Sequence, residues 1–335
     1  MPPIRLDRRA KRLLNILAAT HRDEDSRESV EDRRRSLRNL ALAVDSSTGP
    51  GEAAEHGAIL TPSGWLPFQV FTPAGAGERV LAGLVYFHGG GWVAGGLDTH
   101  AGLCCRLAAT AQCRVLAVDY RLAPEHPFPA ALDDALAATR WAAANASALA
   151  MDPERLAVGG DSTGGALAAA VCHIMRDDGG PCIAAQVLIC PVLDAAGESE
   201  SRRAFGEGYF VNRRTVERDT DDYCPKREDR TDPRISPLRA RRFDSLPPAV
   251  IHAAEFDPFR DEAADYSAAL RAAGVRVREV RHPGMIHYFY AMARAIPYAL
   301  TAAEAVGADL RGLLADQKRM SPASIAANAA ASSRS

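Results

Sequence analysis

The fold is decided by five residues, Gly160-Asp161-Ser162-Thr163-Gly164, which satisfy the pattern Gly-x-Ser-x-Gly. They lie between residues 155–158, a predicted strand, and residues 164–175, a predicted helix of small residues. A serine at such a strand-to-helix turn sits in a tight, strained conformation with its hydroxyl pointing away from the sheet. The alternative is a Gly/Ser turn that only caps a helix. The position between strand and helix favours a nucleophilic serine.

Strands and helices are predicted to alternate on both sides of this turn. Apolar or alternating stretches predict eight strands, over residues 56–61, 66–72, 80–87, 115–120, 155–160, 184–193, 248–254 and 275–281. Helices are predicted over residues 130–145, 164–175, 215–223, 260–273 and 297–314. The first two strands read as an edge hairpin. The alternation of the rest predicts an α/β protein whose eight-stranded, mostly parallel sheet is flanked by helices on both faces.

A second glycine-rich motif, His88-Gly89-Gly90-Gly91-Trp92, directly follows the predicted strand 80–87. Consecutive glycines let a loop turn its N–H groups inward, which suits the negative oxygen that forms when an ester carbonyl is attacked. A motif of this type is the expected second source of such donors beside a Gly-x-Ser-x-Gly turn. A flexible glycine turn is the alternative, and the co-occurrence of the two motifs disfavours it.

A serine hydroxyl is a weak nucleophile, so it needs a histidine base and a carboxylate to hold that base. With this kind of turn the chain order is serine, acid, histidine. The histidines after Ser162 are His173, His252, His282 and His287. His173 falls in the predicted helix and His252 in mid-strand, where core or surface roles are expected. His287 is favoured because it lies deep in the loop expected after residue 281, and His282 is held in reserve.

Asp257 is the favoured carboxylate because it follows the predicted strand 248–254, one strand–helix unit before His287. Asp261 lies one helical turn further on. A negative charge at a helix N-terminus explains Asp261 better than a catalytic role does.

Five stretches resemble the hormone-sensitive-lipase family of α/β-hydrolases, the bacterial esterases with a Gly-Asp-Ser-Ala-Gly-Gly turn. They are residues 86–92, 119–125, 160–165, 257–261 and 284–287, and the resemblance spans about residues 65–315. It implies Ser162 as the nucleophile with Asp257 and His287 as its partners. It implies an oxyanion hole formed by the N–H groups of Gly89, Gly90 and Thr163.

Three residues depart from the family pattern. Thr163 replaces the usual alanine, Phe259 stands where leucine is common, and Tyr288 stands where glycine is frequent. The family also implies a helical cap, which here would comprise residues 1–42 and the inserted segment 195–246.

Five aromatic residues are predicted to line one substrate pocket. They are Trp92, Phe205, Tyr209, Phe210 and Tyr288. For Phe205, Tyr209 and Phe210 the alternative is packing inside the inserted segment. Rings close to the nucleophile would limit the length of the acyl chain.

The implied activity is that of a serine carboxylesterase acting on short to medium acyl esters through an acyl-enzyme, with no cofactor and no metal. An acyltransferase or deacetylase of a specific metabolite could use the same three residues. A non-catalytic binding protein on this scaffold is disfavoured, because Ser162, Asp257 and His287 occur together.

The resemblance implies a small-molecule ester as the partner, and composition disfavours other partners. The 335 residues are 47% hydrophobic and 24% charged, which excludes a largely disordered chain. A net charge of −2 gives no basic excess for nucleic acid, and residues 80–97 contain too many glycines to form a membrane span. Seven cysteines without a Cys-x-x-Cys pair indicate reduced core thiols and a cytoplasmic location. A homodimer is left open.

The expected domain organisation has five parts. Residues 1–50 form N-terminal cap helices and a linker, 51–194 and 247–318 the two parts of the hydrolase core, 195–246 the inserted cap segment, and 319–335 a disordered tail. The interleaved Arg and Asp/Glu residues of the first segment predict a solvated helix face.

Overall fold

One eight-stranded sheet organises the molecule, and the computed structural model describes residues 5–20, 29–45 and 54–320. The strands are β1 Ala54–Thr61, β2 Gly64–Phe71, β3 Leu81–Phe87, β4 Cys113–Val118, β5 Met151–Asp161, β6 Ala185–Ile189, β7 Ala249–Phe256 and β8 Val277–Ile286. Their order across the sheet is β1-β2-β4-β3-β5-β6-β7-β8. Only the β1–β2 and β2–β4 pairs are antiparallel. The prediction of eight strands in a mostly parallel sheet is confirmed.

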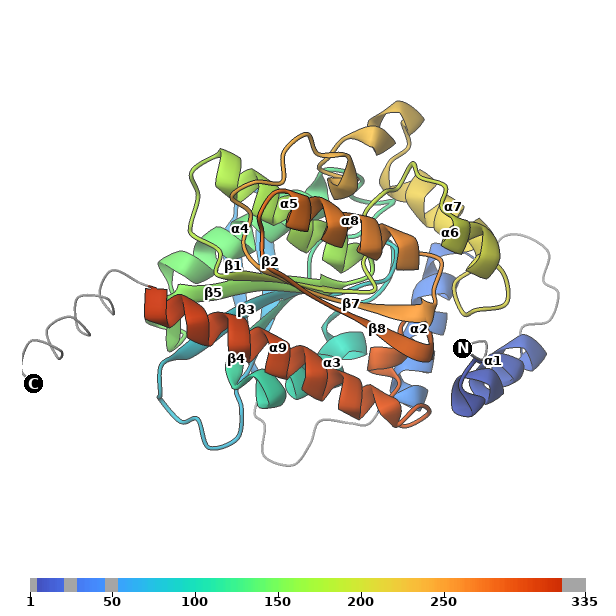
Figure 1. Ribbon diagram of the computed structural model, residues 1–335, viewed down its shortest axis with the longest axis horizontal. Helices are drawn as coiled ribbons and strands as arrows, with labels where there is room; N and C mark the ends of the chain where they lie inside the picture. The colour runs from blue at the N-terminus through green and yellow to red at the C-terminus, as the bar shows by residue number, and fades with distance from the viewer. Residues whose placement is uncertain (1–4, 21–28, 46–53, 321–335) are drawn as a thin grey trace, which may run out of the picture.

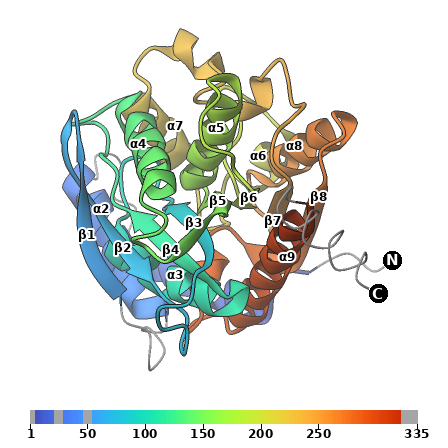
Figure 2. The ribbon, with the colours of Figure 1, turned by 90° about the vertical axis from the view of Figure 1, so that its left-hand side faces the viewer.

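Helices cover both faces of the sheet, as buried parallel strands require. One face carries α4 Ala130–Ala144, α5 Thr163–Asp177 and α8 Arg260–Ala272, and the other carries α3 Leu97–Ala111 and α9 Tyr298–Met320 (Figure 1; Figure 2). The core strands β4 and β6 are buried at every residue. None of the helices in the described part of the chain is long and apolar enough to cross a membrane.

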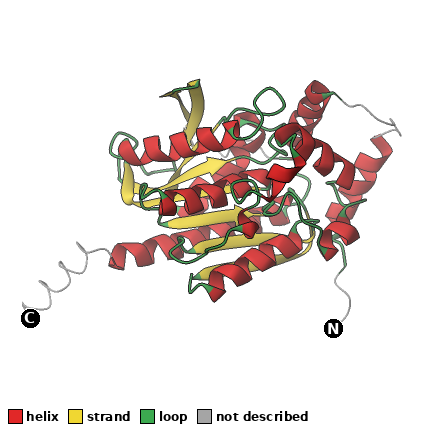
Figure 3. Ribbon diagram, turned by 90° about the horizontal axis from the view of Figure 1, so that it is seen from above, coloured by secondary structure: helices red, strands yellow, loops and turns green. Residues whose placement is uncertain are grey.

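Further helices gather at one end of the sheet (Figure 1; Figure 3). They are α1 Arg8–Thr20, α2 Val30–Val44, α6 Glu200–Phe205 and α7 Arg213–Tyr223. Single 3-10 turns follow at η1 Arg227–Thr231, η2 Pro237–Arg239 and η3 Phe289–Ala291. The linker expected before residue 51 and the tail expected from residue 319 lie almost wholly outside the described residues, so the division into domains stays a prediction.

Strand β8 is longer than its sequence suggests. A loop was expected after residue 281, whereas β8 continues through Pro283 and Gly284 to Ile286. The register against β7 shifts between Ala254 and Phe256, which marks an irregularity of the kind that re-aims a strand. Gly284 keeps a positive φ of 77° inside this strand. His287 therefore leaves the end of a strand rather than the middle of a loop.

Candidate active site

Ser162 occupies the sharp turn between β5 and α5. Its φ of 51° and ψ of −121° lie outside the ordinary regions for a residue with a side chain. The turn packs so closely on β3 that a Cβ on Gly164 would lie 2.0 Å from the carbonyl oxygen of Phe87. A Cβ on Gly160 would meet Gly164 itself, at 2.4 Å. The two flanking glycines are thus required by close backbone approach.

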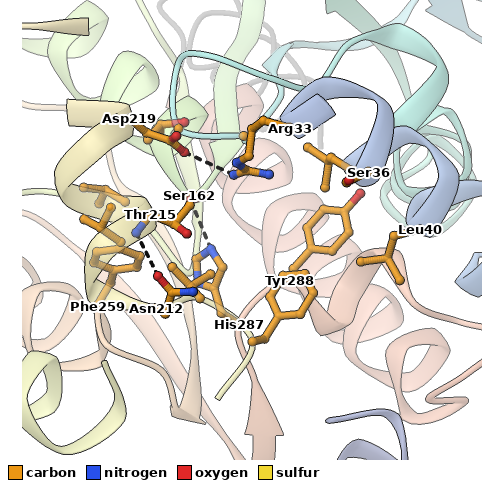
Figure 4. Close-up of a pocket in the computed structure, with 18 of the residues that line it drawn as sticks. Arg33, Ser36, Leu40, Ser162, Asn212, Thr215, Asp219, Phe259, His287 and Tyr288 are labelled. Atoms are coloured by element: carbon orange, nitrogen blue, oxygen red, sulfur yellow. Dashed lines mark hydrogen bonds and ion pairs between the residues drawn. The ribbon is translucent and has the colours of Figure 1, made fainter. Parts of the chain in front are cut away.

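Ser162, Asp257 and His287 come together where β5, β7 and β8 end. Figure 4 shows two of them, Ser162 and His287, facing each other. His287 Nε2 lies 3.0 Å from Ser162 Oγ, and His287 Nδ1 lies 2.8 Å from Asp257 Oδ2. The N–H of Phe259 donates to the other Asp257 oxygen at 2.8 Å. All three candidate residues are buried. This is the geometry in which a histidine can remove the serine proton while a carboxylate holds its ring.

The charge on Asp257 prepares His287 to accept that proton. Burial alone would lower the pKa of His287, but the neighbouring Asp257 charge and hydrogen bond outweigh burial and raise the pKa. A base with a raised pKa takes a proton from a hydroxyl more readily.

The other histidines lie elsewhere. His282 sits within β8 with its Nε2 3.0 Å from His252 Nδ1, and its Nδ1 faces the Tyr298 hydroxyl. His173 packs in α5 with its Nε2 3.2 Å from the Tyr266 hydroxyl. The structure thus brings His287 to Ser162 and places the reserve candidate in a separate buried network.

The N–H of Gly89, which was expected to bind the oxyanion, already has an acceptor within the protein. This N–H donates to Asp161 Oδ1 at 3.0 Å, so the prediction for Gly89 is wrong. Gly90, Gly91 and Thr163 line the cavity beside Ser162. No acceptor among the described residues takes their N–H groups. The candidate oxyanion hole therefore consists of Gly90, Gly91 and Thr163, and sequence reasoning missed Gly91 because it is chemically identical to Gly89.

Asp161 joins the glycine loop to the serine turn. Besides Gly89, it accepts the Tyr86 hydroxyl at 2.7 Å and lies 3.2 Å from His100 Nε2. Burial alone would raise the pKa of Asp161, but the His100 charge and these hydrogen bonds lower it. A second bond joins the same two segments, because the Thr163 hydroxyl accepts the N–H of Trp92 at 3.3 Å. The two halves of the candidate oxyanion hole are thus held together from both sides.

A cavity of about 440 Å³ opens over Ser162. Trp92, Phe210 and Tyr288 line it as expected, whereas Phe205 and Tyr209 do not. Those two rings instead pack around Phe256, at centroid distances of 5.5 and 5.6 Å. The prediction of five pocket aromatics is therefore wrong for two of them.

The sequence offered no clear signal for several other lining residues. Apolar walls come from Leu14, Leu17, Leu37, Leu40, Val192, Val211, Val216 and Phe259. Charged residues also line the cavity, namely Arg33, Asp161, Glu207 and Asp219. Of these, Arg33 was assigned to a solvated helix face. An amphipathic pattern alone cannot distinguish a helix face that meets solvent from one that meets a substrate cavity.

A metal site fits these residues poorly. Within the described ranges, one group of three metal-ligating types has its atoms within 4.8 Å of one another, namely Cys190, Asp257 and His287. Asp257 and His287 are already bonded to each other, and burial raises the pKa of the Cys190 thiol well above its usual value. A cation here would have to displace the thiol proton and break the Asp–His bond. The group fits proton transfer better.

Fold and geometry together define the class of serine hydrolases with an α/β core. A family model described as alpha/beta hydrolase fold matches residues 84–291. The chain belongs to the hormone-sensitive-lipase family of α/β-hydrolases.

Several relatives are named as ester hydrolases. The ethyl acetate hydrolase of Pseudomonas putida is 38% identical over 81% of this chain and 86% of that protein. The carboxylic ester hydrolase LipN of Mycobacterium tuberculosis is 44% identical over 67% of this chain, a match that spans 61% of LipN. The solved ester hydrolase EH1AB1 from the metagenome of Lake Arreo superposes with a TM-score of 0.88 at 38% identity, covering 92% of this chain and 98% of that one.

Proposed function

We propose that this chain is a serine carboxylesterase that hydrolyses esters with short to medium acyl chains through an acyl-enzyme. The observation that carries the proposal is the 3.0 Å contact between His287 Nε2 and Ser162 Oγ, with Asp257 bonded behind the ring. The ester-hydrolase names of the relatives support it.

Acylation begins when His287 takes the Ser162 proton and Oγ attacks the ester carbonyl carbon. The N–H groups of Gly90, Gly91 and Thr163 hold the resulting oxyanion. When the tetrahedral intermediate collapses, the bond to the alcohol oxygen breaks and His287 returns the proton to the departing alcohol. Asp257 keeps the proton on Nδ1 of the neutral ring, which leaves Nε2 free to accept.

Deacylation repeats the same steps with water in place of the serine hydroxyl. His287 removes a proton from water, the hydroxide attacks the acyl carbon, and the proton returns to Ser162 Oγ as the carboxylic acid leaves. The net reaction consumes one water and releases an acid and an alcohol.

The cavity favours small apolar acyl groups. Its leucine and valine walls would bury acyl carbons at roughly 0.8 kcal/mol per CH₂. We infer that Phe210 and Tyr288, which line the same cavity, limit the length of the acyl chain. The substrate is then a small ester. The cytoplasm is the proposed location, since the seven cysteines are free thiols and suit a reducing compartment. A homodimer stays a prediction, which light scattering of the purified chain would check.

Ser162→Ala tests the proposal. Loss of a triad nucleophile costs on the order of a million-fold in kcat, so hydrolysis of p-nitrophenyl acetate should nearly vanish while the circular dichroism spectrum stays unchanged. An organophosphonate should add its mass to the peptide containing Ser162. Ser63→Ala, in an exposed turn between β1 and β2, is the matched control. A Ser162→Ala variant with a tenth of wild-type activity would overturn the proposal.

A further inference from the structure

Arg33 and Asp219 meet at the cavity from the two separate segments that cover the site. Arg33 belongs to α2 and Asp219 to α7, and Arg33 Nη2 lies 3.1 Å from Asp219 Oδ2 (Figure 4). Both residues line the cavity that contains Ser162. The Asp219 side chain is buried and the Arg33 side chain is 19% exposed. An ion pair with a buried carboxylate is costly to desolvate, so stability alone does not explain its place in a largely apolar cavity.

Asp219 packs directly against the candidate oxyanion loop. A Cβ added to Gly91 would lie 2.2 Å from Asp219 Oδ2 and 2.8 Å from Asp219 Cβ. The Asp219 side chain is only 5% exposed, and its Oδ1 has no hydrogen-bond partner in the described part of the chain. A carboxylate thus lies beside the N–H groups that are proposed to hold a negative oxygen.

The carboxylate and the loop cannot move apart easily. Tyr223, one helical turn after Asp219, stacks on Trp92 of the loop at a centroid distance of 4.4 Å. Helix α2 is also bonded to this loop, because Arg34 Nε donates to the Val93 carbonyl at 2.8 Å. Helices α2 and α7 therefore fix the charge pair against the loop.

The sign of the charge at Asp219 matters for the reaction. A negative group near the oxyanion hole opposes the negative charge that develops in the transition state, and low local polarity strengthens that opposition. Burial raises the pKa of Asp219, the Arg33 and Arg218 charges counteract it, and Asp222 adds to it. Arg33 is the cation hydrogen-bonded to Asp219, while Arg218 lies 4.0 Å from its Oδ1.

We propose that Arg33 is a charge-compensating and positioning residue for catalysis: it neutralises Asp219, so that the loop of Gly90 and Gly91 can hold the oxyanion. The proposal rests on the esterase function above and adds a role for helix α2 in it. Arg33 acts through Asp219 and the loop.

Opposite single variants separate this role from a purely structural contact. Arg33→Met leaves a buried carboxylate against Gly91, and kcat for p-nitrophenyl acetate should fall about 10- to 100-fold with little change in KM. Asp219→Asn removes the negative charge and should lower kcat far less. The kcat of the double variant Arg33→Met/Asp219→Asn should be at least tenfold higher than that of Arg33→Met. Equal losses in the two single variants, with no recovery in the double, would mean that only the bond between α2 and α7 matters, and would overturn the proposal.

A pH profile gives an independent readout. Asp219 in Arg33→Met can regain neutrality by taking a proton, so the ratio of its kcat to that of the wild type should rise as pH falls from 8 to 6. In the double variant this ratio should stay flat. A flat ratio in Arg33→Met would contradict charge compensation.

Two further variants complete the test. Arg33→Lys keeps the charge and should retain kcat within about threefold even if Arg33→Met folds poorly; a loss as large as that expected for Arg33→Met would count against the proposal. Arg35→Met, on the exposed side of α2, is the matched control. If Ser162→Ala stays active, the esterase function itself fails; if Ser162→Ala is dead and Arg33→Met keeps wild-type kcat, only the role of Arg33 fails.

Discussion

The N–H of Gly89 donates to Asp161 Oδ1 at 3.0 Å, which joins the loop after β3 to the residue directly before Ser162. These residues are 72 positions apart in the chain. The bond occupies the first glycine N–H of the loop, whereas the N–H groups of Gly90 and Gly91, which line the cavity, have no acceptor among the described residues. The position of the candidate oxyanion hole is thus decided by a carboxylate on a neighbouring strand.

Gly89→Ala should disable the enzyme through this contact. A Cβ at Gly89 would lie 2.4 Å from Asp161 Oδ2 and 3.0 Å from Ser162 Cβ, so the loop and the serine turn must separate. We expect kcat to fall at least 100-fold in a folded protein. Gly312→Ala is the control, since nothing lies within 4 Å of a Cβ at that position in α9. Wild-type turnover by Gly89→Ala would show that the loop tolerates displacement.

His287→Ala and His282→Ala should differ in kind. His287 contacts Ser162 Oγ, so its loss should lower kcat as severely as Ser162→Ala does. His282 contacts His252 and Tyr298, so its loss should lower the melting temperature while kcat of the folded protein remains. Steady-state kinetics and thermal melting of both variants check this. An inactive but stable His282→Ala would reverse the assignment of the base.

As pH falls, kcat/KM should decrease with a midpoint above pH 6.5. His287 must be neutral to act as a base, and the Asp257 charge raises its pKa above the ordinary value of 6.5 despite burial. A plot of kcat/KM against pH measures this midpoint. Asp257→Asn should move it to lower pH and reduce the maximum on the order of 10⁴-fold. A wild-type midpoint below pH 6 would contradict the raised pKa.

The fold should lose stability as pH falls from about 6.5. Burial lowers the pKa of His88 and of His282 to about 3, and that of His173 to about 4. These rings stay neutral in the folded chain but take up protons in the unfolded chain, so each costs up to about 1.4 kcal/mol per pH unit below 6.5. His287 has the opposite sign, since its raised pKa stabilises the fold at low pH and that share is lost as pH rises.

Urea unfolding at a series of pH values measures this loss of stability. His282→Asn should flatten the dependence below pH 6.5, because it removes one of the histidines whose pKa burial lowers. A free energy of unfolding that stays constant from pH 7 to pH 5 would contradict the prediction.

Tyr288 should set the acyl-chain limit. Its ring stacks on Phe210 at a centroid distance of 5.7 Å, and its hydroxyl donates to the Thr99 carbonyl. For the wild type, kcat/KM should rise over the first few acyl carbons and then fall steeply. Tyr288→Gly should move the optimum to longer chains or relax selectivity on the alcohol side, and Tyr288→Phe should change it little.

A series of p-nitrophenyl esters from acetate to laurate measures the limit. The left-handed backbone at Tyr288, with a φ of 65°, suits glycine, so the variant should fold. Undiminished hydrolysis of long-chain triglyceride emulsions by the wild type would show an open cleft.

Local pattern and chain order were sufficient for the sheet and for the contacts among Ser162, Asp257 and His287. These features rest on apolar runs and on motifs whose spacing follows from strand–helix alternation. Helix α3 was not predicted, because it is buried on several sides and has no clear apolar stripe.

Contacts with a distant residue that no sequence motif marks could not be predicted. Gly89 and Gly91 are the same residue type, and only the approach of Asp161 separates their roles. Phe205 and Tyr209 pack on Phe256, which lies about fifty residues later in the chain, and do not line the cavity. The sequence around Arg33 indicates only a solvated charge, because its partner Asp219 lies on the distant helix α7.

The placement of the three candidate catalytic residues has a consequence for how the chain gains activity during synthesis or refolding. Ser162 and His287 are 125 residues apart and follow β5 and β8, with β6 and β7 paired between these strands. No nascent chain that stops short of β8 contains the complete site. Such long-range parallel pairing forms slowly compared with local helices. Ester turnover therefore reports the final closing of the sheet edge, and it should reappear after helical signal has already recovered.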